Sequence, residues 1–533
     1  MPYAITNRCI QCDNCLPQCP QGAIKVMEGE YWIDPILCND CQDYSAPQCL
    51  VYCPVASPIP YQAKKGRCKT DVRTTPSPKL FLNGKSHPFA SSIIIWELCN
   101  VLAQRHSLIW ESNAAGELYY QRQINGGKGA IAFQITDSLE SNIPIPLKSK
   151  EALSAIATFD IRAACMHLIY AAHVTNLNQP WEEEFIINDR QIEEYLGLEK
   201  RKDLSKSAKL ALIKELVQQP CKLIVSINLP AQRKMQGVSL EKSRLWHLLE
   251  TQHHFQADEL GCKHLVGLTF KIKAGEWAQY FLNQQGCQER TALYQYGSLP
   301  KALLSAVMSI WQQHEGAARM MLWLLFKTKM GREQRITIPT LMRVAYGERK
   351  LSQVILQPEN RQRLLRIFES DLEVLNQYGL KPVFDPVTYP LEIQPLWTKL
   401  VDIPEDAEAA LEFWIDDGSH STRLTDAAPR GKWNRLMNAR ILYFDMPPEW
   451  KKQITKSKKK QQTNNRKAKL KPQLTLSTEY ILEARKRLGL SQRDLAQLTG
   501  KSQSWIRDIE NGRFQAKLED QILLRKALGL GMG

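Results

Sequence analysis

The sequence predicts a multidomain α+β protein with a cysteine-rich head, a mixed α/β centre and a small all-α domain near its C-terminal end. Three observations carry this prediction. The chain has 533 residues, which is too long for one ordinary core. Eight of its 14 cysteines form two runs before residue 54. A stretch with ten Lys and Arg and no acidic residue, 451–471, separates residues 474–533 from the rest.

Charge is unevenly distributed along the chain. The net charge is +15, but residues 1–60 carry −4, which leaves +19 on the remainder. A basic body favours a polyanionic partner, most often nucleic acid, although a generic basic surface has the same composition. No apolar run reaches the roughly 20 residues of a membrane span, and the start lacks the apolar core of a signal peptide. We therefore expect a soluble, cytoplasmic protein whose cysteines are not a secreted disulfide framework.

The two cysteine runs have the spacing of iron–sulfur ligands. Spacers of two, two and three residues separate the cysteines of the first run, and spacers of two, seven and three those of the second; proline follows each run. In such runs, three cysteines of one loop bind one cluster and the cysteine before proline binds the other. The expected ligand sets are Cys9, Cys12, Cys15 and Cys53 for one cluster, and Cys38, Cys41, Cys49 and Cys19 for the other. Two zinc sites are the alternative, but zinc explains neither the third cysteine nor the proline.

These runs resemble those of ferredoxins with two [4Fe-4S] clusters. Tyr3-Ala4-Ile5 before the first run and Gly22-Ala23-Ile24 after it add to the resemblance. The seven-residue spacer between Cys41 and Cys49 is that of the longer-loop bacterial type. The resemblance implies a ferredoxin-like domain over residues 1–60 with two [4Fe-4S] clusters as cofactors.

The centre of the chain is predicted as a connector followed by mixed α/β structure. Residues 61–90 form the connector, and 91–180 hold a helix at 91–104 and strands near 107–112, 117–123 and 129–136. Within 181–450, a strand–helix–helix–strand pattern over 184–229 and a strand–helix–helix pattern over 335–385 predict tandem winged helices. Winged helices bind DNA or serve as protein-interaction modules, and this arrangement resembles that of plasmid replication initiators. No catalytic motif is present, so we do not expect an enzyme. His253, His254, Cys262 and His264 fit no standard metal spacing.

Residues 474–533 are predicted to form a helix-turn-helix domain behind a basic linker, residues 451–473. Residues that cap helices alternate with glycines that end them: Ser477 or Thr478, Gly489, Ser491 with Asp494, Gly500 and Ser502. We expect Leu495, Ala496 and Leu498 on the inner face of the second helix. The second helix of such a motif enters the DNA major groove, whereas a helical bundle that binds protein is the alternative.

Residues 482–513 resemble the Cro/phage-repressor family of DNA-binding domains through LGLSQ, DLA, Gly500 and ENG. The resemblance implies that Gln492 and Asn511 hold phosphates, and that Arg507 and Arg513 lie near the DNA backbone. It further implies that Gln503, Ser504 and Asp508 face base edges, and that Arg485 and Glu510 form a partly buried ion pair.

The two terminal motifs and their order resemble the ferredoxin-fused transcriptional activators of cyanobacterial nitrogen fixation genes, the CnfR/PatB type. This resemblance implies activation of nitrogenase genes when oxygen is low, with the clusters as sensor. The implied partners are double-stranded DNA of promoter regions, RNA polymerase and, in a homodimer, a second copy of the chain. Two other classes stay open: a ferredoxin-type electron-transfer partner protein, and a replication-initiator-like DNA-binding protein.

Overall fold

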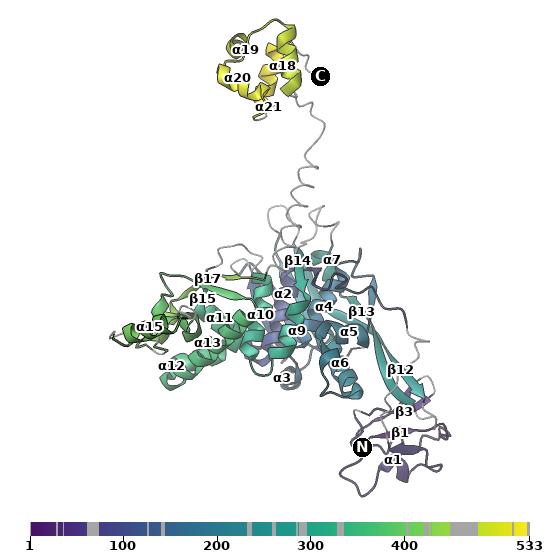
Figure 1. Ribbon diagram of the computed structural model, residues 1–533. Coiled ribbons are helices and arrows are strands. Elements are labelled where there is room, and N and C mark those ends of the chain that lie inside the picture. The colour runs from purple at the N-terminus through teal and green to yellow at the C-terminus, as the bar shows by residue number, and fades with distance from the viewer. Residues whose placement is uncertain are drawn as a thin grey trace. The chain divides into compact units, whose positions relative to one another are not determined.

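The computed structural model of the protein describes residues 2–27, 30–35, 37–60, 74–124, 127–139, 144–231, 237–257, 263–283, 286, 296–327, 335–400, 403, 406–419, 426–427, 429–447, 478–513, 516 and 518–529. These residues form two compact units, one within residues 1–454 and the other within 455–533 (Figure 1). Each unit is described by itself. The basic linker lies outside the described residues.

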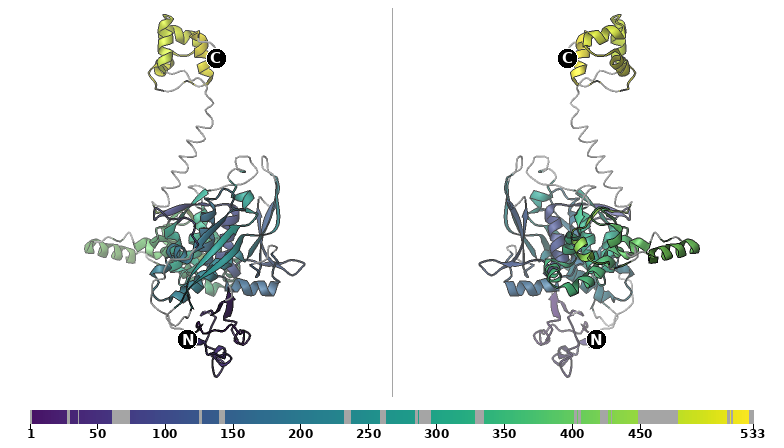
Figure 2. Two further views of the ribbon diagram at one scale, coloured as in Figure 1. Left: turned by 90° about the vertical axis from the view of Figure 1, so that its right-hand side faces the viewer. Right: turned by 90° about the vertical axis from the view of Figure 1, so that its left-hand side faces the viewer.

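The cysteine-rich head, residues 2–60, consists of two short antiparallel strand pairs. Strand β1 (Tyr3–Ile5) pairs with β4 (Pro58–Pro60), and β2 (Ile24–Met27) pairs with β3 (Glu30–Ile33). A single-turn helix, α1 (Gln48–Val51), lies within the second cysteine run. Because β1 and β4 join the two ends of the head, both cysteine runs are enclosed in one small fold, which lies at one end of its unit (Figure 2).

The centre of the chain shares one hydrophobic core, which includes side chains from Leu80 to Phe444. The border expected at residue 180 therefore does not separate two cores. Strand β5 (Ser86–Ala90) pairs with β14 (Tyr296–Pro300), so the end of the expected connector is also part of this core. Helices α2 (Ile93–Gln104), α4 (Ala163–Val174) and α10 (Glu315–Lys327) are apolar and largely buried, and they fill its middle.

A five-stranded antiparallel sheet covers part of this core, with the strand order β11-β10-β8-β7-β6. Its strands are β6 (Glu111–Ser112), β7 (Leu118–Ile124), β8 (Gly129–Ile135), β10 (Leu223–Leu229) and β11 (Val238–Arg244). The helix at 91–104 and the three strands expected after it are thus present, although the first strand is shorter than expected. The expected strand at 223–228 forms, but it pairs with β8 and does not join the preceding strand at 184–188.

Two arrangements of the same topology, which we call the first and second modules, follow one another. Each has, in chain order, a helix, a strand, two or three helices and two more strands, and in each the first strand pairs with the last; other elements intervene, before the last two strands in the first module and between them in the second. The first module consists of α4, β9 (Glu184–Asn188), α5 (Asp189–Leu196), α6 (Lys206–Cys221), β12 (Trp246–Ala257) and β13 (Lys263–Ala274). The second consists of α10, β15 (Ile336–Thr337), α11 (Ile338–Tyr346), α12 (Glu348–Leu356), α13 (Arg361–Gln377), β16 (Lys381–Phe384) and β17 (Arg440–Asp445).

The same local signals begin and end the second helix of both modules. The last residue of the first strand caps this helix: the side chain of Asn188 accepts a hydrogen bond from the backbone N–H of Gln191, and that of Thr337 accepts one from Thr340. The helix ends in both modules at a glycine with positive φ, Gly197 (φ 70°) and Gly347 (φ 84°). The repeat is therefore one of local chemistry as well as of topology.

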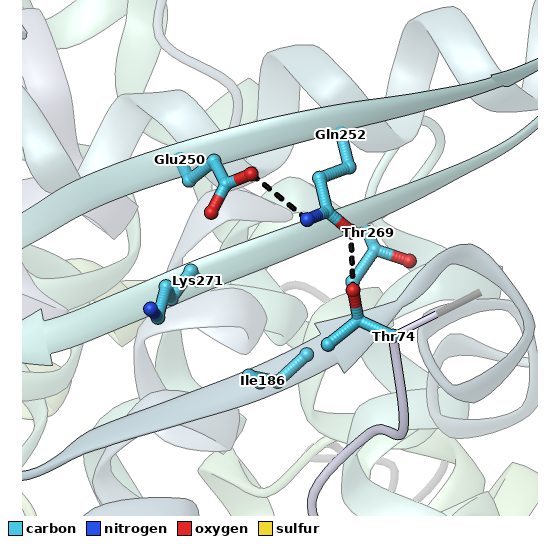
Figure 3. Close-up of a pocket in the computed structure, with 6 residues that line it drawn as sticks. All are labelled: Thr74, Ile186, Glu250, Gln252, Thr269 and Lys271. Carbon is cyan, nitrogen blue, oxygen red and sulfur yellow. Dashed lines mark hydrogen bonds between the residues drawn. The ribbon is translucent and has the colours of Figure 1, made fainter. Parts of the chain in front are cut away.

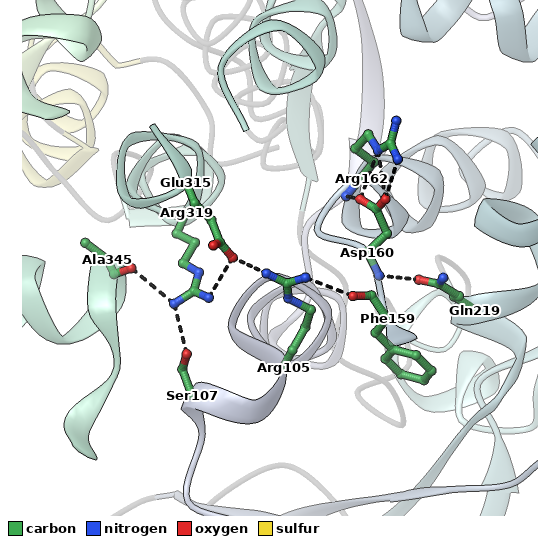
Figure 4. A network of polar contacts seen from close by, with 9 residues as sticks. All are labelled: Arg105, Ser107, Phe159, Asp160, Arg162, Gln219, Glu315, Arg319 and Ala345. Atoms are coloured by element: carbon green, nitrogen blue, oxygen red, sulfur yellow. Dashed lines mark hydrogen bonds and ion pairs between the residues drawn. The ribbon is translucent and has the colours of Figure 1, made fainter. Parts of the chain in front are cut away.

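A network of arginines and a glutamate holds the second module to the rest of the core (Figure 4). The guanidinium of Arg319 donates to Glu315 Oε1 at 2.7 Å and to the carbonyl of Ala345 at 3.1 Å. Arg105 contacts the same carboxylate and donates to the carbonyl of Phe159 at 2.9 Å. Because Phe159 precedes α4, Glu315 and Arg319 lie in α10 and Ala345 lies in α11, the network connects the start of the first module with two helices of the second.

Further helices surround the modules: α3 (Ser149–Thr158), α7 (Ala278–Phe281), α9 (Lys301–Ile310), α14 (Leu396–Leu400), α15 (Ala407–Ser419) and α16 (Lys432–Met437). Short 3-10 helices lie at Arg105–Ser107, Leu198–Lys200, Pro358–Asn360 and Leu391–Ile393. Among the described residues no single helix has the length and apolarity to cross a membrane, while α3 and α4 have them only together, as a pair bent by 87°.

The second unit is a four-helix domain. Its helices are α18 (Thr478–Arg487), α19 (Gln492–Thr499), α20 (Gln503–Glu510) and α21 (Leu518–Ala527). The expected capping box of Ser491 with Asp494 is present, Gly500 ends α19 in the left-handed conformation and Ser502 caps α20. One expectation is wrong: the side chain of Leu498 is 60% exposed, and Thr499 takes the inner position.

Candidate metal centre and nucleic-acid interface

The cysteine loops of the head owe their shape to backbone in the left-handed region. Gln11 (φ 55°) and Asp13 (φ 59°) lie between cysteines of the first run, and Asp40 (φ 64°) and Cys41 (φ 49°) lie in the second. Non-glycine residues adopt this conformation rarely. In these loops, the left-handed conformation reverses the chain direction within a two-residue spacer, so that successive cysteine side chains can point into the same loop.

The fold brings cysteines of the two runs together. Burial raises the pKa of the Cys15 thiol to about 11, and the neighbouring thiols that add to this shift include Cys53, from the other run. Burial likewise raises the pKa of Cys49 to about 12, with Cys38, Cys41, Cys15 and Cys19 as charged neighbours. Cys53 thus lies near the first run and Cys19 near the second. This is the exchange that the spacing predicts, and the assignment of four thiols to each cluster stays a prediction.

The donor set fits iron–sulfur clusters chemically. Burial raises the pKa of Cys15 and Cys49, so these thiols ionise only beside a strong positive charge, which bound iron would supply. Backbone N–H groups also point at the sulfurs: Ala23 donates to Cys19 Sγ and Ser57 to Cys53 Sγ, both at 3.2 Å. Such bonds stabilise thiolates bound to a cluster. Within the described residues, no group of three or more His, Cys, Asp or Glu is spaced to hold one metal ion.

The head contacts the first module through a tryptophan. The ring of Trp32, in β3, lies 4.9 Å from that of Phe255 and 5.8 Å from that of His253, both in β12. Lys214 of α6 approaches His253 Nε2 at 3.4 Å. Burial, followed by the charge of Lys214, lowers the pKa of His253 to about 4, so this ring is neutral at pH 7. Local sequence patterns did not predict this contact, since 223 residues separate Trp32 from Phe255.

The helix-turn-helix of the second unit is held by a buried ion pair. Arg485 Nε donates to Glu510 Oε1 at 2.6 Å, and the Glu510 side chain is 2% exposed. The side-chain amide of Gln492 donates to the other oxygen of Glu510 at 2.7 Å. The expected ion pair is therefore present. Gln492, which the resemblance assigns to a phosphate, is here tied to the same carboxylate.

Helix α20 presents a polar face to solvent. Gln503, Ser504 and Arg507 are exposed, while Ile506 and Ile509 are buried on the opposite side. Asp508 is partly neutralised within the protein, because Arg513 contacts its carboxylate at 3.0 Å and Arg507 at 3.5 Å. Asn511 is exposed at the C-terminal cap of the helix. The seven residues expected to contact DNA thus gather on and beside α19 and α20, and their individual roles stay predictions.

A hollow on the exposed side of the first module's three-stranded sheet is lined by polar side chains (Figure 3). Gln252 donates to Glu250 at 2.8 Å and accepts from Thr74 at 2.6 Å, beside Lys271 and Thr269. The arrangement contains no nucleophile paired with a base.

The comparisons with known proteins match the two ends of the chain. The helix-turn-helix family model, HTH_3, matches residues 481–533. Ferredoxin-2 of Chlorobaculum tepidum is 41% identical over 56 residues, which are 10% of this chain and 90% of that protein. The chain belongs to the ferredoxin-like family. An uncharacterized ferredoxin-like protein of Haemophilus influenzae is 45% identical over 60 residues, 11% of this chain and 70% of that protein.

Other ferredoxin-like relatives are matched over a smaller share of their length. The "ferredoxin-like protein in nif region" of Nostoc sp. PCC 7120 is 51% identical over 57 residues, 10% of this chain and 49% of that protein. The chain thus spans about half of that relative. Among solved structures, domains 2 and 3 of RctB are similar with a TM-score of 0.25 at 11% identity, covering 50% of this chain and 85% of that one. Together the matches establish a ferredoxin-like segment, which implies iron–sulfur binding, and a helix-turn-helix that supports binding to double-stranded DNA.

Proposed function

We propose that the protein is an oxygen- or redox-responsive transcriptional activator without catalytic activity of its own. Its targets in this proposal are nitrogenase genes at low oxygen, and two [4Fe-4S] clusters are its sensor. The observation that carries the proposal is the contact between β3 of the head and β12, because it gives the cluster ligands a physical route into the body of the protein. The Nostoc relative, named for its place in a nif region, supports the choice of target genes.

The head has too little apolar core to be stable by itself. Its buried cluster of apolar side chains holds four aliphatic residues, Ile5, Ala23, Ile24 and Ile33, with Cys15 and Cys49. Domains of this size usually need metals or disulfides to fold. Bound clusters would supply oxygen-labile cross-links between the two cysteine runs. Without those cross-links, β3 would lose its order and Trp32 would leave Phe255.

The two modules fit winged helices, in which two strands follow a helix-turn-helix and the last of them pairs with the strand before that motif. In the first module these two strands form a hairpin, whereas in the second residues 385–439 separate them. The strand orders β12-β13-β9 and β15-β17-β16 support this assignment. In the first module the hairpin β12–β13 would be the wing, and it is the element that the head contacts. The module that receives the signal is thus itself of a DNA-binding type.

The test is to measure target transcripts at low oxygen in strains that carry the wild type, Cys12→Ser or Cys38→Ser, with protein amounts matched by immunoblot. The proposal predicts that both variants accumulate but activate at least tenfold less. Full activation by both variants would contradict the sensor role.

A further inference from the structure

The helix pair of the second module carries a basic face beyond the C-terminal helix-turn-helix. Four cations, Arg349 and Lys350 on α12 and Arg363 and Arg366 on α13, are exposed, and none forms an ion pair with another described residue. The acidic side chains nearby do not offset them. Glu348 is paired with Arg343, and Glu359 is the one exposed acid among the residues from 348 to 367.

The polar side chains of α12 are spaced for one contact surface. Leu351 and Val354 are buried, so Arg349, Ser352, Gln353 and Leu356 lie on the opposite side of the helix. On α13 the exposed residues Arg363, Arg366 and Ile367 recur at three- and four-residue spacing. A helix with cations that flank a glutamine and a serine has the composition of a major-groove reader.

Arg361 holds the two helices at a fixed angle. Its guanidinium donates to the carbonyls of Val354 at 3.4 Å and Ile355 at 2.5 Å, in the last turn of α12, from its own place at the start of α13. It also lies 5.8 Å from the ring of Trp433. The basic residues of both helices are therefore presented by a rigid element, as a duplex contact requires.

The equivalent helix of the first module differs. Lys206 of α6 is used inside the protein, paired with Asp189 at 2.9 Å and with Glu193 at 2.6 Å. Lys214 lies against His253, beside the contact with the head. Lys206 and Lys214 of α6 thus serve internal contacts, whereas Arg349, Lys350, Arg363 and Arg366 of the second module are exposed.

We infer that α12 and α13 form a second binding site for double-stranded DNA, with α12 in the groove and Arg363 and Arg366 on the phosphates. The chain then binds DNA at two sites, this one and the C-terminal helix-turn-helix. The inference does not depend on which genes are regulated or on the role of the clusters.

The test compares full-length, anaerobically purified protein with a variant in which Arg349, Lys350, Arg363 and Arg366 are all replaced by alanine. A matched control replaces four exposed lysines outside this face, Lys128, Lys150, Lys200 and Lys202. Fluorescence anisotropy on one duplex gives affinity against salt. Loss of the two phosphate contacts of Arg363 and Arg366 should reduce the steepness of log K against log salt by about 2, and loss of all four cations should weaken binding at least tenfold. The control should keep the wild-type slope.

A second measurement tests the inference without the four-alanine variant, so that it does not depend on how well that variant folds. In the otherwise wild-type chain, Gln353→benzoylphenylalanine places a photo-crosslinker on α12, and the same substitution at Lys128 is its control. Crosslinking of DNA from position 353 alone supports the inference. A four-alanine variant with the wild-type melting temperature and salt slope overturns it, as does crosslinking from position 353 to protein only, which would assign the face to a protein partner or a second copy.

Discussion

Trp32 of the cysteine-rich head packs against Phe255 of β12, with ring centroids 4.9 Å apart and ring planes at 60°. Trp32 lies in β3, which pairs with β2, the strand that follows the first cysteine run. The Trp32 residue is 5% exposed. Trp32 is not part of the head's own cluster of buried apolar side chains. The Trp32 side chain therefore connects the head with the hairpin β12–β13, beside which β1 also contacts β13.

Removing this contact should separate the head from the body without removing its ligands. Phe255→Ala leaves every cysteine in place but deletes the surface on which Trp32 rests. Phe255 is partly buried, so its truncation should cost less than the about 3–5 kcal/mol of a fully buried aromatic, and local opening of the head should still become easier. Hydrogen exchange of β3 measures it. Leu249→Ala changes a residue of the same strand that is 47% exposed, and it should leave the hydrogen exchange of β3 unchanged. Equal exchange of β3 in both variants would show that the contact does not stabilise the head.

Each four-cysteine set should hold one cluster. We expect about eight iron and eight acid-labile sulfide per chain after anaerobic purification. Cys53→Ser should reduce iron by about half and affect the cluster of Cys9, Cys12 and Cys15, far away in sequence. Two zinc per chain in iron-free anaerobic preparations would instead show structural zinc sites. Cys99→Ser, which changes a buried thiol outside the head, should leave iron content unchanged.

The Arg485–Glu510 pair should matter more for stability than the exposed pair beside it. Arg485→Ala leaves Glu510, 2% exposed, without its main partner. An uncompensated buried charge costs about 3–5 kcal/mol, so the C-terminal domain should melt many degrees lower. Arg513→Ala breaks a pair in which the arginine side chain is 66% exposed, and it should cost less than about 1 kcal/mol. Equal melting temperatures of the two variants would refute the difference.

The C-terminal domain should read DNA sequence through α20 and gain affinity from the linker. Gln503→Ala should cost about 1–3 kcal/mol at the specific site and relax base preference there. Neutralising Lys458, Lys459 and Lys460 should weaken binding to every sequence and reduce the salt dependence. Footprinting and anisotropy separate the two effects. If promoter selection survives Gln503→Ala unchanged, another residue reads the bases.

Acid should destabilise the core through His167. Burial lowers the pKa of this histidine to about 4, although its hydrogen bond to the carbonyl of Ile95 at 2.9 Å acts in the opposite direction. Trp246 donates to the other ring nitrogen, Nδ1, at 3.1 Å. Its pKa is lower folded than unfolded, so stability is full above about pH 6.5 and falls as pH drops towards 4. The loss from this group should reach about 2 kcal/mol by pH 5. Denaturant melts of wild type and His167→Gln at both pH values measure it; an equal pH dependence would contradict the assignment.

Local signals in the sequence predicted local structure well. The caps Ser491 and Ser502 and the stop at Gly500 were read correctly, because a capping bond involves residues three or four apart. Leu498 was misplaced by one position, since a helix of eight residues gives a weak periodicity. Helix α12 was not predicted at all.

Local sequence patterns did not predict which strands and side chains far apart in the chain contact one another. Alternating apolar residues predicted the strand at 223–228, but they do not specify its partner, and β10 pairs with β8 although α3, α4, β9, α5 and α6 lie between them in the chain. The contact of Trp32 with Phe255 has no local signature either. By contrast, the spacing of the cysteines alone predicts which of them bind each cluster, because two- and three-residue spacers are a property of the loops themselves.

The central claim, that cluster integrity gates activation, is tested most directly by one transcription measurement on one protein sample. Purified wild-type protein is assayed with RNA polymerase on a target promoter before air exposure, after it, and after anaerobic rebuilding with iron and sulfide. The account predicts activation that falls at least five-fold in air and returns on rebuilding, a coupling of about 1 kcal/mol or more. Equal activation in all three states would contradict it.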